Sequence, residues 1–342
     1  GPGADGPAHA RLGQPRGEEP AAMTALRQRG AALLAAMLTV TLVAAFAASA
    51  LWQQWRAIEV EAAERTRIQA AWMLLGALDW SRLILAEDAR GSGSDSLAEP
   101  WAVPLAEARL STFLAAQNNV SQVEDASVDT TDAFLSGEIT DLQSRLNLRN
   151  LLGAKPPSVA VLRPFERLFE RLGVDQGQLT QLVAGLRSAH QGAGGDAPLL
   201  PVNVEQLGWL GLAPDVVARL APYLVILPQP TKVNLNTASV DVLWAAVDGL
   251  SQADAQRLVQ ARQQRTFNTV AQAQEVLGNQ GGQQMGDQVD TQTAFFEVRG
   301  RLRLDTTTVE ERSVVQRRGS QVVVLWRQRS ALPPKASFEN AG

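Results

Sequence analysis

The uncharged segment Ala31–Trp52 constrains the fold of this chain more than any other feature. It follows directly on a basic leader that ends in Arg27, Gln28, Arg29 and Gly30. A run of this length without charge can cross the hydrocarbon core of a bilayer as a helix. The arginines before it predict that the N-terminus lies in the cytoplasm and that the bulk of the chain lies on the other side of the membrane.

The helix is expected to continue well beyond the membrane. Residues 31–88 contain no proline, Gly76 is their only glycine, and alanine and leucine, which favour helices, dominate. From about Trp55, apolar residues recur at the spacing of a helix face that packs on a globular head. The predicted face consists of Ile58, Ala62, Ile68, Trp72, Leu75 and Leu78. Trp72 and Trp80 are expected to anchor the core.

Three interpretations of the N-terminus fit the sequence. The run is a cleaved secretory signal with Ala45–Ala50 as its cleavage site, or a simple signal anchor, or a helix that follows a type IV prepilin leader cut between Gly30 and Ala31. The run exceeds a usual secretory signal core, and helix is predicted beyond the supposed cut, so we favour the third. Residues 1–22 are expected to be disordered, and a start at Met23 would give a short leader.

The composition excludes several kinds of site. The chain has 342 residues and no cysteine, so disulfides, thiol catalysis and zinc–thiolate sites are excluded. Its net charge of −4 does not supply the positive footprint that nonspecific nucleic-acid binding needs. His9 lies in the leader and His190 beside a glycine-rich loop, and no nucleophile or phosphate-binding motif occurs. We therefore expect no enzyme.

Beyond the long helix the sequence predicts an α+β fold. A Gly/Ser-rich break at residues 91–96 precedes two strand-like stretches, Val120–Val128 and Gly137–Asn147. Helical segments then alternate with Pro, Gly and Asn signals: Val159–Leu172, Gln176–His190, Asn203–Leu210, Pro214–Leu220, Ser239–Val247, Ser251–Arg262 and Thr269–Leu277. The last segments, Phe295–Leu304, Thr306–Gln316 and Gln321–Arg327, predict an antiparallel meander.

These patterns predict a long N-terminal helix packed on an antiparallel sheet, with a large all-α insert between the early and the late strands. The expected boundaries are 1–30 for the leader, 31–52 for the membrane-spanning part, 53–150 for the amphipathic helix and first strands, 151–278 for the insert, 279–330 for the last strands and 331–342 for a tail. Core burial must stabilise the exported part, because disulfides are excluded.

Three stretches resemble one known family. The chain looks like a type IV pilin-like protein in Arg27–Leu34, in the long helix with Trp52–Trp55 and in the sheet predicted at the C-terminus. Asp141–Leu151, which reads DLQSRLNLRNL, resembles a stretch of the K-type minor pseudopilin of type II secretion (general secretion pathway protein K). Val233–Ser239, inside the helical block, resembles a second stretch of the same family. Together these features cover most of Arg27–Arg327.

The resemblance implies a minor pseudopilin at the tip of the pseudopilus, which initiates its assembly and supports protein export across the outer membrane. The prepilin peptidase would cut after Gly30, and Ala31 would become a methylated N-terminus. Pilins usually carry a glutamate at the fifth mature position, whereas this chain has Ala35 there. A subunit ahead of this one would therefore find no carboxylate to pair with its N-terminal ammonium. A buried unpaired charge is costly.

The implied partners are the other minor pseudopilins, the major pseudopilin, the prepilin peptidase and the inner membrane, together with secreted substrates and the outer-membrane channel. The implied location is the bacterial inner membrane, crossed once, with the C-terminal domain in the periplasm. K-type pseudopilins also hold calcium, which prefers hard oxygen ligands. Candidate ligands are Glu124, Asp125, Asp129, Asp132, Asp287 and Asp290, but neither cluster has the spacing of a regular calcium loop.

A second resemblance leads to a different function. Residues 233–277 resemble the helix-hairpin-helix of DNA-uptake proteins, which would make the chain a membrane-anchored periplasmic DNA-binding protein. In such domains a glycine-flanked hairpin offers backbone N–H groups to a phosphate. Here the hairpin Asp248–Ser251 contains an acid, and aspartates offset the charge of Arg257, Arg262 and Arg265. We therefore do not expect nucleic acid as a partner.

The segment Val233–Ser239 also has a purely structural interpretation. Asn234 and Asn236 would fix a turn through their side-chain amides. Thr237 or Ser239 would cap the helix that follows. In this case the segment serves the fold of the insert and binds no ligand.

Overall fold

The computed structural model describes residues 21–91, 93–111, 133–153, 155–192, 198–278, 285, 287–304 and 307–332. Its contacts divide the chain into two compact units, Gly1–Arg67 and Ile68–Gly342. The predicted strand Val120–Val128 and the predicted tail beyond residue 332 lie outside the described residues.

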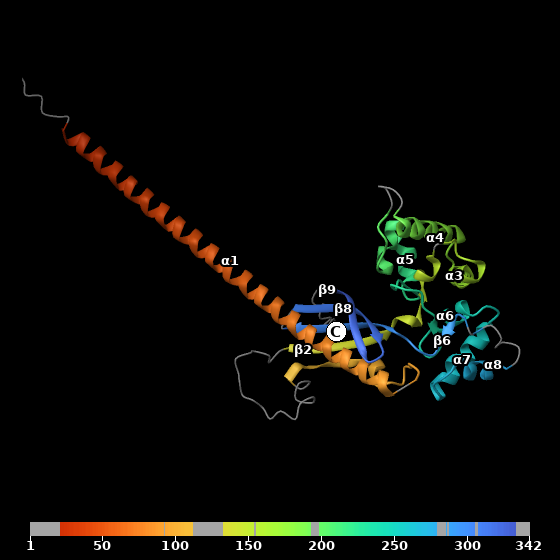
Figure 1. Ribbon diagram of the computed structural model, residues 1–342. Coiled ribbons are helices and arrows are strands. Elements are labelled where there is room, and N and C mark those ends of the chain that lie inside the picture. Colours follow the sequence, from red (N-terminus) through yellow and green to blue (C-terminus); the bar gives the residue numbers. More distant parts are fainter. Residues whose placement is uncertain are drawn as a thin grey trace, which may run out of the picture. The chain divides into compact units, whose positions relative to one another are not determined.

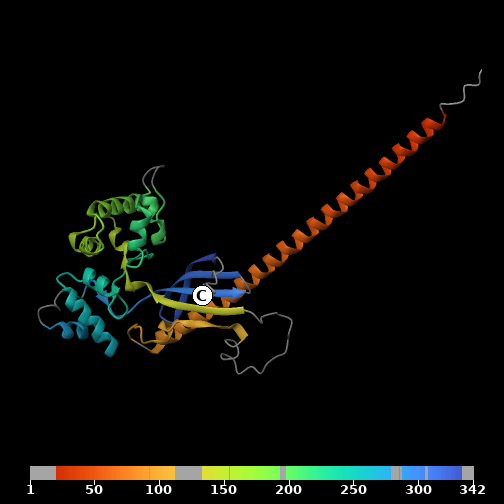
Figure 2. The ribbon, with the colours of Figure 1, turned by 180° about the vertical axis from the view of Figure 1, so that it is seen from behind.

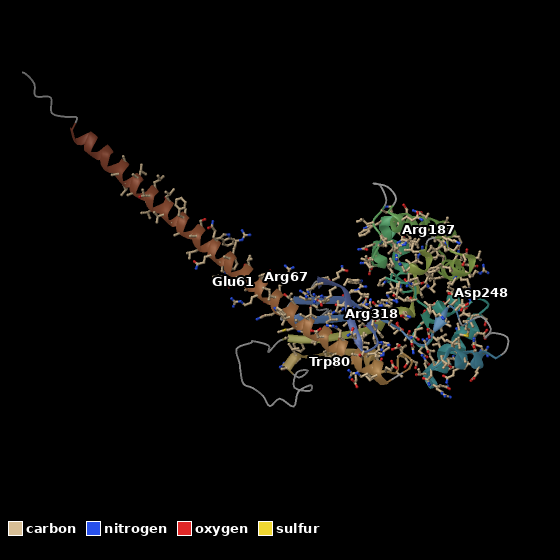
Figure 3. All side chains as sticks on the ribbon, viewed as in Figure 1. Glu61, Arg67, Trp80, Arg187, Asp248 and Arg318 are labelled. Atoms are coloured by element: carbon tan, nitrogen blue, oxygen red, sulfur yellow. The ribbon has the colours of Figure 1, made fainter. Side chains whose placement is uncertain are left out.

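Helix α1 runs without interruption from Ala21 to Gly91 (Figure 1). It begins before the predicted Ala31, because eight of the ten residues 21–30 are Ala, Arg, Met, Leu or Gln, which favour helices. The expectation of disorder is therefore wrong for residues 21–22. Residues 31–65 are exposed along their whole length. Figure 3 shows Glu61 and Arg67 projecting from the helix.

The part of α1 that belongs to the second unit packs on a sheet. Its buried face consists of Ala70, Leu74, Leu78, Ser81 and Leu85, which recur every three to four residues. The predicted face is correct only for Leu78: the exposed fractions of Ile68 and Trp72 are 50% and 68%, and Trp80 is half-buried. Small side chains at 70 and 81 allow the helix backbone to approach the sheet, and Leu74, Leu78 and Leu85 fill the space between them.

The sheet has five antiparallel strands in the order β1-β2-β7-β8-β9. They are β1 Leu105–Arg109, β2 Ala133–Asp141, β7 Phe295–Leu304, β8 Thr307–Arg318 and β9 Gln321–Leu332. The last three confirm the predicted meander, and Gly319 provides a φ of 58° in its final turn. The predicted strand Gly137–Asn147 is wrong for residues 142–145, where a 3-10 turn follows β2, and Leu146–Asn147 is a separate short strand.

The insert lies between β2 and β7, which are neighbours in the sheet. Figures 1 and 2 show its helices in two groups, α3–α5 and α6–α8. The helices are α3 Val159–Arg171, α4 Gln176–Gln191, α5 Pro214–Leu220, α6 Val240–Ala246, α7 Gln252–Gln264 and α8 Val270–Leu277. These bounds agree with the predicted helical segments to within a few residues.

Short elements complete the described structure of the second unit. They are the 3-10 helices η1 Pro100–Ala102, η2 Leu142–Ser144, η3 Leu148–Leu151 and η4 Val204–Leu210. Four two-residue strands form two parallel pairs: β3 Leu146–Asn147 with β4 Leu224–Val225, and β5 Val233–Asn234 with β6 Val289–Asp290. The segment predicted as a helix at Asn203–Leu210 is the 3-10 helix η4, with Asn203 as its cap.

The insert has a hydrophobic core of its own. The buried side chains of this core extend from Leu146 to Val289, so the insert is wider than the predicted 151–278. A second cluster, which includes Leu142, Phe295 and Val314, joins the insert to the face of the sheet opposite α1. The insert is therefore continuous in its packing with the sheet.

Candidate functional site

The N-terminal part of α1 forms a membrane anchor by length and composition. From Ala31 it is the one helix, among the described residues, that is long and apolar enough to cross a membrane, with a mean hydropathy of 2.3 and no burial in its most apolar window. Gly30, Ala31 and Ala35 all lie within this helix, and Ala35 is exposed. No charged residue occurs between Arg29 and Arg56.

An apolar line of residues continues along α1 on the side that faces away from the sheet. We call this line the outward stripe: Ile68, Trp72, Gly76 and Leu83, whose spacing places them on one helix face. Asp79, which pairs with Arg82, lies on the same face between Gly76 and Leu83. Trp72 and Leu83 are each 68% exposed, and the space beside the Gly76 Cα is open. Exposed apolar surface of this kind marks interaction sites in soluble domains.

A buried carboxylate, Asp141, holds the insert to the end of β2. Its Oδ1 accepts a hydrogen bond from the Gln143 backbone N–H at 2.7 Å. Its Oδ2 accepts bonds from Asn234 Nδ2 at 2.9 Å and from the Thr237 hydroxyl at 2.6 Å. Burial raises the pKa of Asp141 above its usual range, and these hydrogen bonds lower it in part. Hydrogen bonds of the Asp141 side chain therefore link the first family-like stretch to the second.

The amide side chains of the two family-like stretches bond to distant backbone. Asn147 Nδ2 donates to the Gln229 carbonyl at 2.8 Å, and its Oδ1 accepts from the Leu227 N–H at 3.1 Å. Asn236 bonds both the N–H and the carbonyl of Phe267, at 3.0 and 2.9 Å. Buried polar groups of this kind stabilise a fold when all their bonds are made. These asparagines fix loops of the insert.

The structural interpretation of Val233–Ser239 is confirmed in most of its details. Asn234 Oδ1 accepts a bond from the Asn236 N–H at 2.9 Å, as expected for a fixed turn. The Ser239 hydroxyl caps α6 by accepting from the Val242 N–H at 3.3 Å. Thr237 does not cap the helix, because its hydroxyl donates to Asp141.

A cluster of three acidic side chains at the end of α1 was not predicted from the sequence. Asp88, Asp95 and Glu99 place one carboxylate oxygen each within 4.8 Å of one another. Arg317 bonds both Asp88, at 2.8 Å, and Asp95, and the Trp101 indole N–H donates to Glu99 at 2.6 Å. Burial, followed by the negative charge of Glu99, raises the pKa of Asp88 to about 6. Arg317 and Trp101 thus already bond to the three carboxylates.

The predicted calcium ligands fall into two sets. Glu124, Asp125, Asp129 and Asp132 lie outside the described residues. Asp287 is exposed, and Asp290 Oδ1 accepts a bond from the Thr291 N–H at 2.8 Å. Within the part of the chain that the structure describes, Asp287 and Asp290 belong to no cluster of three carboxylates. The described residues alone do not make a calcium cage at this loop.

The hairpin between α6 and α7 is bound from within the insert. Gly249 has a φ of 74°, and its N–H donates to the Asp248 carboxylate at 3.0 Å. Arg167 of α3 donates to the carbonyls of Val247 and Leu250 at 2.7 and 2.9 Å. Figure 3 shows Asp248 at this hairpin. A carboxylate therefore lies where a helix-hairpin-helix would hold a phosphate.

The arginines near this hairpin are also engaged. Arg257 bonds Asp254, and Arg262 donates to the Leu235 carbonyl at 2.6 Å. Burial lowers the pKa of Arg262 to about 10. A strong positive field for a nucleic-acid backbone needs free cations, and these two are bound to protein groups.

Known proteins resemble the chain in sequence. A family model described as type II secretion system protein K matches residues 233–293. Proteins named type II secretion system protein K from Klebsiella pneumoniae and Pseudomonas aeruginosa are 30% and 27% identical to it, over 72% and 71% of this chain and 78% and 74% of theirs. A third, from Pectobacterium carotovorum, is 24% identical over 88% of this chain and 96% of its own.

A solved structure resembles the chain in fold. It is a chain of the crystal structure of the GspK-GspI-GspJ complex from the enterotoxigenic Escherichia coli type 2 secretion system. The TM-score is 0.58, the identity is 18%, and the match covers 78% of this chain and 98% of that one. At this identity the match shows a shared fold.

The apolar helix and the antiparallel sheet on which its continuation packs define a class, the membrane-anchored proteins of type IV pilin-like fold. Within that class, the insert between β2 and β7 carries the segment that matches the family model, residues 233–293. The sequence match to the Klebsiella relative covers more than two thirds of both proteins. The chain belongs to the type II secretion system protein K family and is a minor pseudopilin.

Proposed function

We propose that this pseudopilin occupies the tip of the pseudopilus and starts its assembly, and thereby supports protein export across the outer membrane. The observation that carries the proposal is Ala35, which stands at the fifth position after Gly30 in an uncharged helix. A subunit stacked ahead of this one would have no carboxylate for its N-terminal ammonium. An unpaired charge in an apolar environment costs several kcal/mol, which disfavours such stacking.

The insert supports the same position. The insert emerges at the end of the sheet where Asp141 lies opposite Phe296. Leu85 and Asp88, in the last turns of α1, contact the same end of the sheet. Arg312 of β8 adds an ionic link, with bonds to Glu205 of the insert at 3.0 Å and Glu297 of β7 at 2.9 Å. A wide head fixed in this way would hinder a further subunit.

The proposed partners are pseudopilins that resemble GspI and GspJ, since the structural neighbour is part of a complex with those proteins. The outward stripe is the proposed surface for a helix of such a partner, because it exposes the large apolar side chains of Ile68, Trp72 and Leu83. Contacts with the major pseudopilin, with secreted substrates and with the outer-membrane channel belong to the same proposal.

The proposed topology has the leader in the cytoplasm and residues after the anchor in the periplasm. The prepilin peptidase would cut between Gly30 and Ala31, and Ala31 would be methylated. The arginines of the leader and the absence of charge up to Arg56 support this orientation. We also expect the chain to have no catalytic activity.

The tip position is tested by counting copies. The chain has no cysteine, so one cysteine at exposed Thr180 of α4 gives a unique label. Labelled pseudopili sheared from cells should carry this label at one end only, in one copy per filament. Labels repeated along the filament would contradict the tip position.

Calcium binding at the loop that carries Asp287 and Asp290 is a separate proposal, supported by their carboxylate chemistry. Isothermal titration of the full chain with calcium should show binding that the double variant D287N/D290N lacks. Equal binding by the parent and the double variant would exclude this loop.

A further inference from the structure

A cavity of about 260 Å³ lies between α1 and the sheet, within the second unit. Leu74, Ala77, Leu78 and Ser81 of α1 line one wall. The strands β2, β7 and β8 line the other, and Trp80, labelled in Figure 3, also contributes. The cavity is separate from the outward stripe, which lies on another face of the helix.

The hollow follows from one row of residues across the sheet. Gly137, Gly300, Glu311 and Arg329 lie opposite one another on β2, β7, β8 and β9, and therefore share a face. That face is the one under α1, because a Cβ at Gly300 would lie 3.2 Å from the Leu74 side chain. The two glycines place no side chain beneath the helix, and both line the cavity.

The row also places a carboxylate in this space. Glu311 lines the cavity and is only 3% exposed. Arg329 donates twice to its Oε2, once from Nε at 3.0 Å. Its Oε1 is buried and has no hydrogen-bond partner among the described residues. Leaving such an acceptor unpaired costs about 1–3 kcal/mol, which a bound donor would recover.

The surroundings select the kind of donor. The lining residues are mostly aliphatic and aromatic, and the serines at 81, 136 and 313 are further polar residues beside Glu311. Dry cavities of about 150 Å³ already hold a benzene ring. Arg329 balances the charge of Glu311, so a second cation would be an uncompensated buried charge. A neutral donor on an apolar body fits best.

We propose that this cavity binds a small neutral amphiphile, with an aryl or alkyl body beneath α1 and one N–H or O–H group that donates to Glu311 Oε1. Ligand sites generally have this composition, with apolar walls and few polar groups. The site is independent of the position of the subunit in a filament.

Indole and benzofuran are matched probes, because they have the same shape and only indole has an N–H donor. The full chain in lipid nanodiscs is dialysed against each probe, with empty nanodiscs as the measure of lipid partition. The protein should bind indole about tenfold more tightly than benzofuran, the ratio expected for one buried hydrogen bond to a charged acceptor. Equal retention of indole by loaded and empty nanodiscs would overturn the site.

Two variants separate the hydrogen bond from the cavity. In E311Q the amide oxygen should keep the bonds from Arg329, so that the NH2 group, a donor, faces the cavity. The preference for indole over benzofuran should then disappear. A77M fills the cavity and should abolish the binding of both probes, whereas A63M, the same change at an exposed position of α1, should bind like the parent. Parental binding by A77M would place the probes elsewhere, and a preference unchanged in E311Q would exclude Glu311 as acceptor.

Discussion

Asp88 shows how the environment of one residue can make stability depend on pH. Its side chain is 8% exposed and contacts Arg317, yet burial and Glu99 raise its pKa from 3.8 to about 6. A carboxyl whose pKa is higher in the folded state binds a proton more tightly when folded. The folded protein therefore gains stability from this group as the pH falls through 6 toward 3.8, and loses it as the pH rises.

The variant D88N should remove this dependence. Relative to D88N, the free energy of unfolding of the parent should rise by about 1–3 kcal/mol between about pH 7 and about pH 4, because the parent carboxyl takes up its proton on folding. Urea titrations followed by tryptophan fluorescence measure it. D215N, at an aspartate whose side chain is 75% exposed, is the control. A constant difference between D88N and the parent would contradict the shifted pKa.

Asp141 should be among the residues most important for stability. Removal of its carboxylate in D141A leaves three buried donors, on Gln143, Asn234 and Thr237, without an acceptor. At about 1–3 kcal/mol for each unpaired donor, we expect a loss of at least about 3 kcal/mol in the free energy of unfolding. The exposed control D215A should change it by less than about 0.5 kcal/mol. A similar small loss for D141A would contradict the proposed role.

Local residue roles were predictable and distant ones were not. The turn at Asn234 and the cap at Ser239 depend on neighbours within three residues, which the sequence displays. The contact of Arg317 with Asp88 joins residues more than two hundred positions apart, and the sequence carries no signal for it. The same holds for Asp141 and Thr237, which the sequence placed in separate motifs.

At the scale of elements, the two faces of α1 have different tasks. The inward face uses Ala70, Leu74, Leu78, Ser81 and Leu85 to pack on the sheet. The outward stripe keeps Ile68, Trp72 and Leu83 in solvent. The exposure of a side chain as large as Trp72 in the single chain is explained if another helix covers it in the assembly.

Single cysteines test the outward stripe. L83C should form crosslinks to the other minor pseudopilins in cells when a short bifunctional thiol reagent and a partner cysteine are present, because the stripe is the proposed interface. T180C, on the exposed face of α4, should give several-fold fewer crosslinks. Equal yields at the two positions, measured by immunoblotting, would argue against the stripe.

The elements that the sequence predicted well are those with regular patterns. The insert helices and the β7–β9 meander were predicted from apolar spacing and turn residues, and the structure has them at nearly the same bounds. The inward face of α1 was mispredicted, because the large residues Ile68 and Trp72 dominate the apolar pattern. The buried face instead combines small Ala70 and Ser81 with three leucines. Strand β1 was missed, because its sequence LAEAR is short and has no strand-forming residues.

At the scale of the whole molecule, a pilin-like sheet carries a large insert between two paired strands. Asp141 and Phe296 remain opposite each other although more than a hundred and fifty residues separate them in sequence. The hydrogen bonds of Asp141 and the ionic link of Arg312 join the insert to the sheet at two points. Insert and sheet therefore form one head, which is the basis for the proposed tip position.

The mass of the mature N-terminal peptide tests the central claim most directly, that this chain is a processed pseudopilin. Protein purified from membranes of cells with an active prepilin peptidase should begin at Ala31, with one added methyl group. Substitution of Gly30 or deletion of the peptidase should leave the leader attached. A chain that begins near Leu51, or one that keeps its leader in peptidase-positive cells, would contradict the account.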